Sequence, residues 1–291
     1  MIRCDKSFLR RVELDTAHSV HYSKHKGGVE METDNGVAIA GAHALVTGAN
    51  RGLGKALVRE LLDRGAAKVY AAARNPATIS IEDDRAVPLG LDITKPDDVR
   101  AAAQRCADVS VLINNAGAML RTPLLASPDL SAARDEMETN YFGTLRMCRA
   151  FAPVLASQGG GVLVNIVSVA SWLTSPFNGS YGASKSAEWA LTNAARIELR
   201  SQGTLVVAVH AGWIDTDMAA TVSDTMISPH DVASQTLDAI RHGDEEVLAD
   251  AFTREVKASL SGDQAPFYRD LQNSWDAESW PWERNSQGSP A

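Results

Sequence analysis

Short apolar runs alternate along the chain with segments that have helical periodicity. The runs have almost no polar face, as is typical of strands in a parallel sheet that is covered on both sides. We expect strands at residues 43–47, 68–73, 86–91, 109–114, 162–167, 204–210 and 246–249, and helices at residues 52–64, 95–106, 131–157, 180–200 and 229–242. This alternation predicts right-handed βαβ units and an α/β fold: a single-domain, Rossmann-type, doubly wound parallel sheet of about seven strands.

The two ends of the chain differ from this central domain, which we place at residues 41–261. Residues 1–40 carry scattered charges and three histidines, His18, His21 and His25, with no further metal ligands beside them. We expect a flexible or loosely docked extension there. Residues 262–291 hold half of the tryptophans, which are Trp275, Trp280 and Trp282. This tail either packs on the core or on a neighbouring subunit, or is disordered.

Composition excludes several classes of function. The formal net charge of −8 argues against a nucleic-acid surface, which needs a basic stripe. Cys4, Cys106 and Cys148 lie far apart, so we expect unpaired thiols in a reducing compartment and no cysteine metal site. There is no apolar run of bilayer length and no hydrophobic leader segment. These features predict a cytoplasmic protein with no metal, nucleic-acid or membrane partner.

A glycine-rich turn, Thr47-Gly48-Ala49-Asn50-Arg51-Gly52-Leu53-Gly54, joins the first predicted strand to the first predicted helix. Glycine allows a tight turn and a close approach of the backbone to a ligand. The helix N-terminus presents unpaired N–H groups and partial positive charge. In the first βα unit, this pattern predicts a site for the pyrophosphate of a dinucleotide.

Tyr181 and Lys185 lie one turn apart on a predicted helix, so their side chains share a face. A nearby ammonium favours the phenolate form, which allows Tyr181 to act as an acid or a base near neutral pH. With Ser168 upstream and the glycine turn, the pair predicts hydride transfer between a nicotinamide and a carbonyl or alcohol.

The spacing T-G-x-x-x-G-x-G, the run Asn114-Asn115-Ala116-Gly117, Ser168 and Tyr181-x-x-x-Lys185 together resemble the short-chain dehydrogenase/reductase family over about residues 41–260. The resemblance implies that Asn140 completes a catalytic tetrad, by holding a water that links the lysine to solvent. Ser168 would bind the substrate oxygen, and Lys185 the cofactor ribose. Two departures, Ala211 for the usual proline and Ser110 for a frequent aspartate, affect local structure and leave the tetrad intact.

The second predicted strand ends at Arg74 without the carboxylate that enzymes selecting NAD usually place there. Arg74 and Arg51 are candidates to bind a 2′-phosphate, so we predict NADP(H) over NAD(H), with two solvated arginines as the alternative. With the adenine, ribose and nicotinamide positions that the resemblance implies, the predicted cofactor residues are Gly48, Asn50, Arg51, Gly52, Leu53, Arg74, Asp92, Ile93, Asn115, Ala116, Gly117, Tyr181, Lys185, Gly212, Ile214 and Thr216.

By their positions near the tetrad, the predicted substrate-pocket residues are Ala170, Trp172, Phe177, Trp213 and Met218. This mostly apolar set favours a hydrophobic aldehyde or ketone, as in the carbonyl-reductase-like branch of the family, with reduction as the expected direction. The chain lacks the insertion before the tyrosine that monomeric carbonyl reductases carry, which implies a homodimer or homotetramer. Two alternatives remain open. One is a nucleotide-binding regulator or scaffold without turnover, and the other is an epimerase or dehydratase with tightly held NAD.

Overall fold

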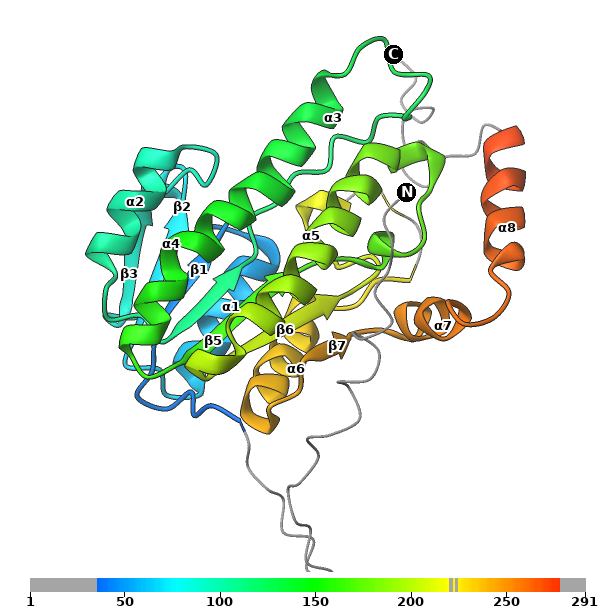
Figure 1. Cartoon of the computed structure of the whole chain (residues 1–291). Helices are drawn as coiled ribbons and strands as arrows, with labels where there is room; N and C mark the ends of the chain where they lie inside the picture. Colours follow the sequence, from blue (N-terminus) through cyan, green and yellow to red (C-terminus); the bar gives the residue numbers. More distant parts are fainter. Residues whose placement is uncertain (1–35, 220–221, 223–224, 278–291) are drawn as a thin grey trace, which may run out of the picture. The chain divides into compact units, whose positions relative to one another are not determined.

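The computed structural model describes residues 36–219, 222 and 225–277. Seven parallel strands form one sheet in the order β3-β2-β1-β4-β5-β6-β7. Their bounds are β1 His43–Thr47, β2 Lys68–Ala73, β3 Ala86–Gly90, β4 Val111–Asn114, β5 Gly161–Ile166, β6 Thr204–His210 and β7 Glu246–Leu248. The predicted doubly wound parallel sheet is therefore confirmed (Figure 1).

Helices cover both faces of the sheet. Helices α1 (Gly52–Asp63) and α6 (Pro229–His242) pack against each other on one face. Helices α2 (Pro96–Arg105), α4 (Thr144–Ser157) and α5 (Gly179–Glu198) cover the other. Helices α7 (Ala251–Ser259) and α8 (Ala265–Asp276) follow β7 and are coloured orange and red in Figure 1.

Neighbouring residues of each strand enter opposite cores. In β1, Ala44 and Val46 pack in the α1/α6 core, whereas Leu45 packs in the core on the other face. In β4, Val111 and Ile113 contribute to the first core and Leu112 to the second. A strand buried on both faces needs apolar residues at every position, which is why these strands show no alternation in the sequence.

Two local features differ from the expectations, and a third adds detail to the tail. The predicted helix 131–157 contains α3 (Ser131–Glu136), a π-helical segment at Met137–Gly143, and then α4. The folded part begins before residue 41, since Val37 N–H donates to the Ile240 carbonyl and Ile39 is buried. Within the predicted tail 262–291, α8 is helical. Cys4, the three histidines of the extension, Trp280 and Trp282 lie outside the described residues.

The strand order reverses direction between β1 and β4, which are neighbours in the sheet. The connections leave these two strands toward opposite ends of the sheet, so a crevice forms at their carboxyl ends. Both the glycine turn after β1 and the Asn115-Ala116-Gly117 segment after β4 begin at this edge. The topology thus brings together two motifs that are about 60 residues apart in the sequence.

Candidate active site

A cavity of about 1330 Å³ opens at the carboxyl ends of the strands. Its lining includes every residue of the predicted cofactor set. It also includes Ser168, Tyr181 and Lys185 of the predicted tetrad, and Ala170, Phe177, Trp213 and Met218 of the predicted substrate pocket. Asn140 and Trp172 do not line it. The fold therefore gathers nearly all of the predicted site residues around one space.

The glycine turn has the backbone geometry that its sequence requires. Gly48 and Gly52 have φ values of +65° and +52°, in the left-handed region that favours glycine. A Cβ atom on Gly54 would lie 2.1 Å from the Gly48 carbonyl oxygen, so only glycine allows the helix to start this close to the turn. Helix α1 has neither a side-chain cap nor an acidic residue in its first turn. Its N-terminus is therefore suited to an anion.

Thr47 and Asn115 fasten the glycine turn to the segment after β4. The Thr47 hydroxyl oxygen accepts hydrogen bonds from the backbone N–H groups of Asn115, at 2.9 Å, and Ala116, at 3.0 Å. The Asn115 amide donates to the carbonyl oxygens of Thr47, at 2.9 Å, and Gly48, at 3.2 Å. The structural role of Thr47 was not predicted, because its partners are distant in sequence.

The two arginines at the cavity differ in their surroundings. Arg51 forms an exposed ion pair with Asp217, with 3.2 Å between Nη1 and Oδ2. Arg74 is exposed at the end of β2 and makes no hydrogen bond or ion pair within the described part of the chain. Its charge nevertheless acts on Asp92, whose pKa is lowered: burial raises it, but hydrogen bonds from Thr94 and the nearby cations outweigh that effect. Arg74 is thus the more available of the two for an anionic ligand.

Tyr181 and Lys185 share a face of α5, with the Lys185 ammonium 5.9 Å from the centre of the Tyr181 ring. Ser168 follows β5 and begins a short 3₁₀ turn, in which its hydroxyl oxygen accepts a hydrogen bond from Ala170 N–H at 3.1 Å. The hydroxyl proton of Ser168 remains able to donate. The cavity thus has a phenol, a hydroxyl and an ammonium on its wall.

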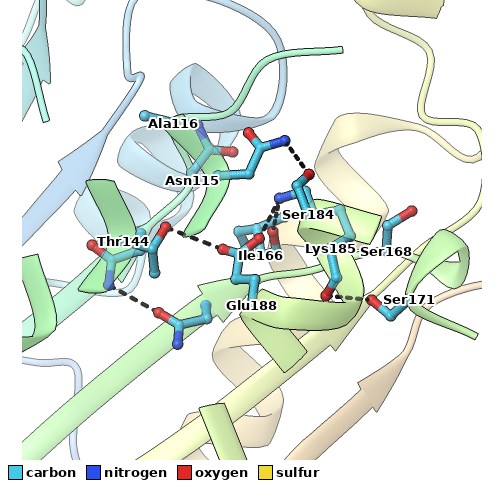
Figure 2. Close-up of polar contacts among 12 residues, drawn as sticks. Asn115, Ala116, Thr144, Ile166, Ser168, Ser171, Ser184, Lys185 and Glu188 are labelled. Carbon is cyan, nitrogen blue, oxygen red and sulfur yellow. Dashed lines mark hydrogen bonds and ion pairs between the residues drawn. The ribbon is translucent and has the colours of Figure 1, made fainter. Parts of the chain in front are cut away.

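Lys185 is buried and paired with Glu188, one turn later on α5. The Lys185 ammonium donates to Glu188 Oε2 at 2.6 Å and to the Ile166 carbonyl oxygen at 2.9 Å. Thr144 donates to the other Glu188 oxygen at 3.3 Å, so the carboxylate lies between Thr144 and Lys185 (Figure 2). Burial acts to lower the pKa of Lys185, but the Glu188 carboxylate overcomes this and raises it. Burial raises the pKa of Glu188, and the ammonium opposes that shift.

Sequence reasoning did not identify Glu188. The only signal was an acidic residue three positions after the lysine of the Tyr-x-x-x-Lys motif, a spacing that is also common in solvent-exposed helix pairs. Burial distinguishes the two situations: the side chains of Lys185 and Glu188 are 5% and 1% exposed.

Asn140 lies in the π-helical segment and is fully buried. Its side-chain oxygen accepts from Ala118 N–H at 2.8 Å, and its amide donates to the Ala118 carbonyl at 2.9 Å and to Ser184 Oγ at 2.8 Å. Asn140 therefore fixes the backbone after Gly117 against α5. A π-helical insertion is a frequent feature of functional sites. The water-holding role that the resemblance implies for Asn140 stays a prediction.

The expectation that Trp172 lines the substrate pocket is wrong. Its indole stacks on His210, with ring centroids 3.8 Å apart, and meets Trp189 edge-on at 6.0 Å. The Lys257 ammonium lies 4.5 Å from the centre of the indole. Trp172 belongs to a small apolar core beneath α7, with Leu173 and Val256. The turn that starts at Ser168 directs Ala170 toward the cavity and Trp172 away from it. The positions of these residues in the sequence did not reveal this difference.

Helices α7 and α8 supply cavity residues that were not predicted. Phe252, Phe267 and Leu271 line the cavity, the latter two from positions four apart on α8. The ring of Trp275 on α8 packs 5.6 Å from the ring of Phe177. Trp275 therefore contacts the wall of the cavity, which was one of the two alternatives for the tail.

Comparisons with known proteins agree with this geometry. The model of the short chain dehydrogenase family matches residues 42–227, more than half of the chain. The chain belongs to the short-chain dehydrogenase family. It is 31% identical over 193 residues to a 3-oxoacyl-(acyl-carrier-protein) reductase of Vibrio cholerae, a match that covers 64% of this chain and 79% of that protein.

Two solved structures are also similar. A short chain dehydrogenase from Burkholderia cenocepacia, in complex with NADP, has 41% sequence identity and a TM-score of 0.77, and the match covers 81% of this chain and 99% of that one. A 3-ketoacyl-(acyl-carrier-protein) reductase from Brucella melitensis, complexed with NADH, has 25% identity and a TM-score of 0.66, over 72% and 96% of the two chains.

Family membership makes this chain an oxidoreductase that acts on the CH–OH/C=O pair of a small molecule. Among the described residues, none of the helices combines the length and the apolar character that a membrane span requires. The same residues contain no cluster of three or more histidine, cysteine, aspartate or glutamate side chains that could hold a metal ion.

Proposed function

We propose that this protein is an NADP(H)-dependent reductase of hydrophobic aldehydes or ketones, with Tyr181 as the general acid. The observation that carries the proposal is that one cavity is lined by the glycine turn and Arg74 and also by Tyr181, Lys185 and Ser168. Its volume of about 1330 Å³ exceeds the roughly 300–1,000 Å³ of most single-ligand pockets. That volume is consistent with a dinucleotide and a substrate bound together.

The residues present fit a dinucleotide. Gly48 and Gly52 form a cradle in the left-handed region of φ, next to the uncapped N-terminus of α1, where a pyrophosphate would bind. Asp92 and Ile93 would flank the adenine, and Lys185 would hold a ribose hydroxyl. When bound, NADPH supplies a hydride to the carbonyl carbon of the substrate.

Arg74 supports a preference for NADP(H). It is an unpaired guanidinium at the end of β2, among the described residues, at the position where NAD-selective enzymes carry an acid. The Burkholderia relative was solved with NADP, and the more distant Brucella relative with NADH. The higher identity of the first favours the phosphorylated cofactor here.

The chain's own residues then have separate tasks. Ser168 donates its hydroxyl proton to the substrate oxygen and orients the carbonyl. Tyr181 transfers its proton to that oxygen as the negative charge develops there. The Lys185 ammonium stabilises the phenolate that remains on Tyr181.

The apolar part of the cavity wall supports a hydrophobic substrate. It includes Phe177, Trp213, Met218, Phe252 and Leu271, beside polar residues such as Asp250 and Asp270. Such a wall favours the body of an apolar carbonyl compound over a strongly charged one.

We also propose pairing of subunits through α4 and α5, giving a homodimer or homotetramer.

The test is a titration of the purified protein with NADPH and NADH, monitored by fluorescence, followed by turnover at 340 nm. The panel contains aromatic and aliphatic ketones and aldehydes, and a 3-oxoacyl thioester because two relatives reduce such substrates. We expect NADPH to bind more tightly and apolar carbonyls to be reduced. NADPH binding with no turnover on the whole panel would favour the alternative, a regulator or scaffold of the same fold.

A further inference from the structure

Glu188 does not line the cavity, but it forms a hydrogen bond with Lys185, which does line it. Its carboxylate is 2.6 Å from the Lys185 ammonium, and both side chains are almost completely buried. We propose that Glu188 is a positioning residue for Lys185, which keeps the ammonium charged and aimed at the cavity. This inference rests on the proposed function, because Lys185 matters only if Tyr181 and a cofactor work beside it.

The hydrogen bonds of the Lys185 ammonium explain why it is directed toward the cavity. An ammonium has three N–H donors. Glu188 Oε2 and the Ile166 carbonyl accept two of them, at 2.6 Å and 2.9 Å, so one donor remains for the cavity that Lys185 lines. Without the carboxylate, the flexible lysine side chain would have only one fixed acceptor behind it.

The position of Glu188 is itself fixed. Thr144, on α4, donates to Oε1 at 3.3 Å and thereby holds the carboxylate from the side away from Lys185 (Figure 2). The Thr144 side chain is fully buried. A carboxylate held from two helices restricts the lysine more than an exposed pair along one helix does.

The carboxylate of Glu188 explains why the buried Lys185 stays charged. A lysine taken out of water tends to lose its proton, because the ammonium loses its hydration. In this protein the neighbouring carboxylate reverses that tendency and raises the pKa of Lys185. Removing the carboxylate's negative charge therefore makes proton loss from Lys185 easier.

Two other titratable groups near the pair, Cys148 and His210, keep one protonation state at working pH. Cys148 of α4 is buried, and burial together with the charge of Glu188 raises the pKa of its thiol to about 12. His210 of β6 is buried, which lowers its pKa to about 3. Glu136 of α3 is bonded to Ser180 and to Leu120 N–H. A shift in the pH profile after substitution at residue 188 would thus report on Lys185.

The decisive variant is Glu188→Gln, which keeps the shape and a hydrogen-bond acceptor but removes the charge. Reduction requires a charged Lys185, so the alkaline limb of the pH profile of kcat should move to lower pH by about one unit in this variant. At pH 6.5 the variant should retain kcat within about threefold. Glu188→Asp keeps the charge, so its limb should stay within about 0.3 units of that of the wild type.

The matched control is Glu60→Gln. Glu60 is also buried and forms an ion pair with Arg64 at 2.8 Å, but it lies on α1 outside the cavity lining. This variant should lose stability without any shift of the pH profile. A Glu188→Gln profile that superimposes on that of the wild type would overturn the inference, whatever the thermal stability of the variant.

NADPH binding gives a readout that does not depend on turnover or on a soluble variant. The wild-type dissociation constant should change less than about twofold between pH 7 and 9, because Lys185 stays charged over that range. A progressive tenfold weakening over this interval would show that Glu188 does not keep the ammonium charged. A wild type that reduces none of the carbonyls refutes the proposed function, whereas a tenfold weakening of NADPH binding refutes the role of Glu188.

Discussion

The imidazole of His210 stacks on the indole of Trp172, with ring centroids 3.8 Å apart and an angle of 19° between the planes. His210 Nδ1 lies 3.1 Å from the Ser168 carbonyl oxygen. Because a carbonyl only accepts hydrogen bonds, Nδ1 carries a proton, and the lowered pKa of the buried ring leaves Nε2 unprotonated and the ring neutral. The stack thus links the last residue of β6 to the turn that presents Ser168, and it depends on an uncharged ring.

This arrangement predicts a loss of stability in weak acid. Burial lowers the pKa of His210 from 6.5 to about 3, so the unfolded chain binds a proton below about pH 6.5 while the folded chain does not. Stability contributed by this residue is therefore complete above pH 6.5 and is lost as the pH falls toward 3. Between pH 7 and pH 5 the free energy of unfolding should fall by about 2 kcal/mol.

Urea unfolding at pH 7 and pH 5 measures this difference. His210→Asn should be less stable at pH 7 and should lose most of the dependence on pH. His242→Asn alters an exposed histidine at the end of α6, and this variant should keep the dependence of stability on pH. A wild-type free energy of unfolding that is the same at both pH values would contradict the buried, neutral state of His210.

Arg74 should control the choice of cofactor. Arg74→Ala removes a charge-assisted contact to the 2′-phosphate, so NADPH should bind about 10- to 100-fold more weakly. NADH lacks that phosphate, and its affinity should change less than about threefold. Fluorescence titration with both cofactors provides the comparison. Arg51→Ala tests the other candidate for the 2′-phosphate, and we expect it to weaken NADPH less, because Arg51 is already paired with Asp217. An equal loss for both cofactors would mean that the phosphate binds elsewhere.

The fold was predictable because the central strands are apolar on both faces, as Leu45 between Ala44 and Val46 illustrates. The bounds of β1, β2 and β6 are as predicted, and those of the other strands differ by one or two residues, since apolar side chains continue past the last ladder bond, as at Val109 before β4. The site motifs were predictable because each is contiguous, and the sheet only had to bring their ends together.

Contacts between distant segments were not predictable. Glu188 depends on Thr144 and Ile166 from other elements, and nothing in its own segment distinguishes it from an exposed acid. The orientation of Trp172 depends on His210 and Lys257. The contribution of α8 depends on contacts such as the one between Trp275 and Phe177. Each of these requires the tertiary structure, because neither periodicity nor a local motif encodes the partner.

Tyr181→Phe tests the general acid directly. The substitution keeps the ring and removes only the hydroxyl, so the half-buried helix face should pack as before. Turnover should fall about 100-fold or more, the usual loss for general acid–base catalysis. The NADPH dissociation constant should change less than about threefold. Stopped-flow measurement of the reductive step, with binding measured on the same preparation, separates the two. Retention of more than a tenth of the turnover would mean that another group supplies the proton.

The close approach at the start of α1 makes Gly54 a sensitive position. A Cβ there would lie 2.1 Å from the Gly48 carbonyl oxygen and 2.6 Å from Asn115 Nδ2, and both of these groups are fixed by the bonds that join the glycine turn to the segment after β4. Gly54→Ala must push the turn and the helix apart, at a cost of about 1–3 kcal/mol in stability. NADPH affinity should fall at least about tenfold, because the cradle and the helix N-terminus would no longer face the same pyrophosphate.

Gly90→Ala is the control for this effect. Its Cβ would meet only Pro76, at 3.7 Å, which is an ordinary van der Waals distance, and Gly90 does not line the cavity. We expect this variant to unfold within about 1 kcal/mol of the wild type and to bind NADPH normally. Calorimetry and NADPH titration of the two variants together separate crowding at the turn from a general effect of replacing glycine. If Gly54→Ala and Gly90→Ala bind NADPH equally well, the turn does not hold the pyrophosphate.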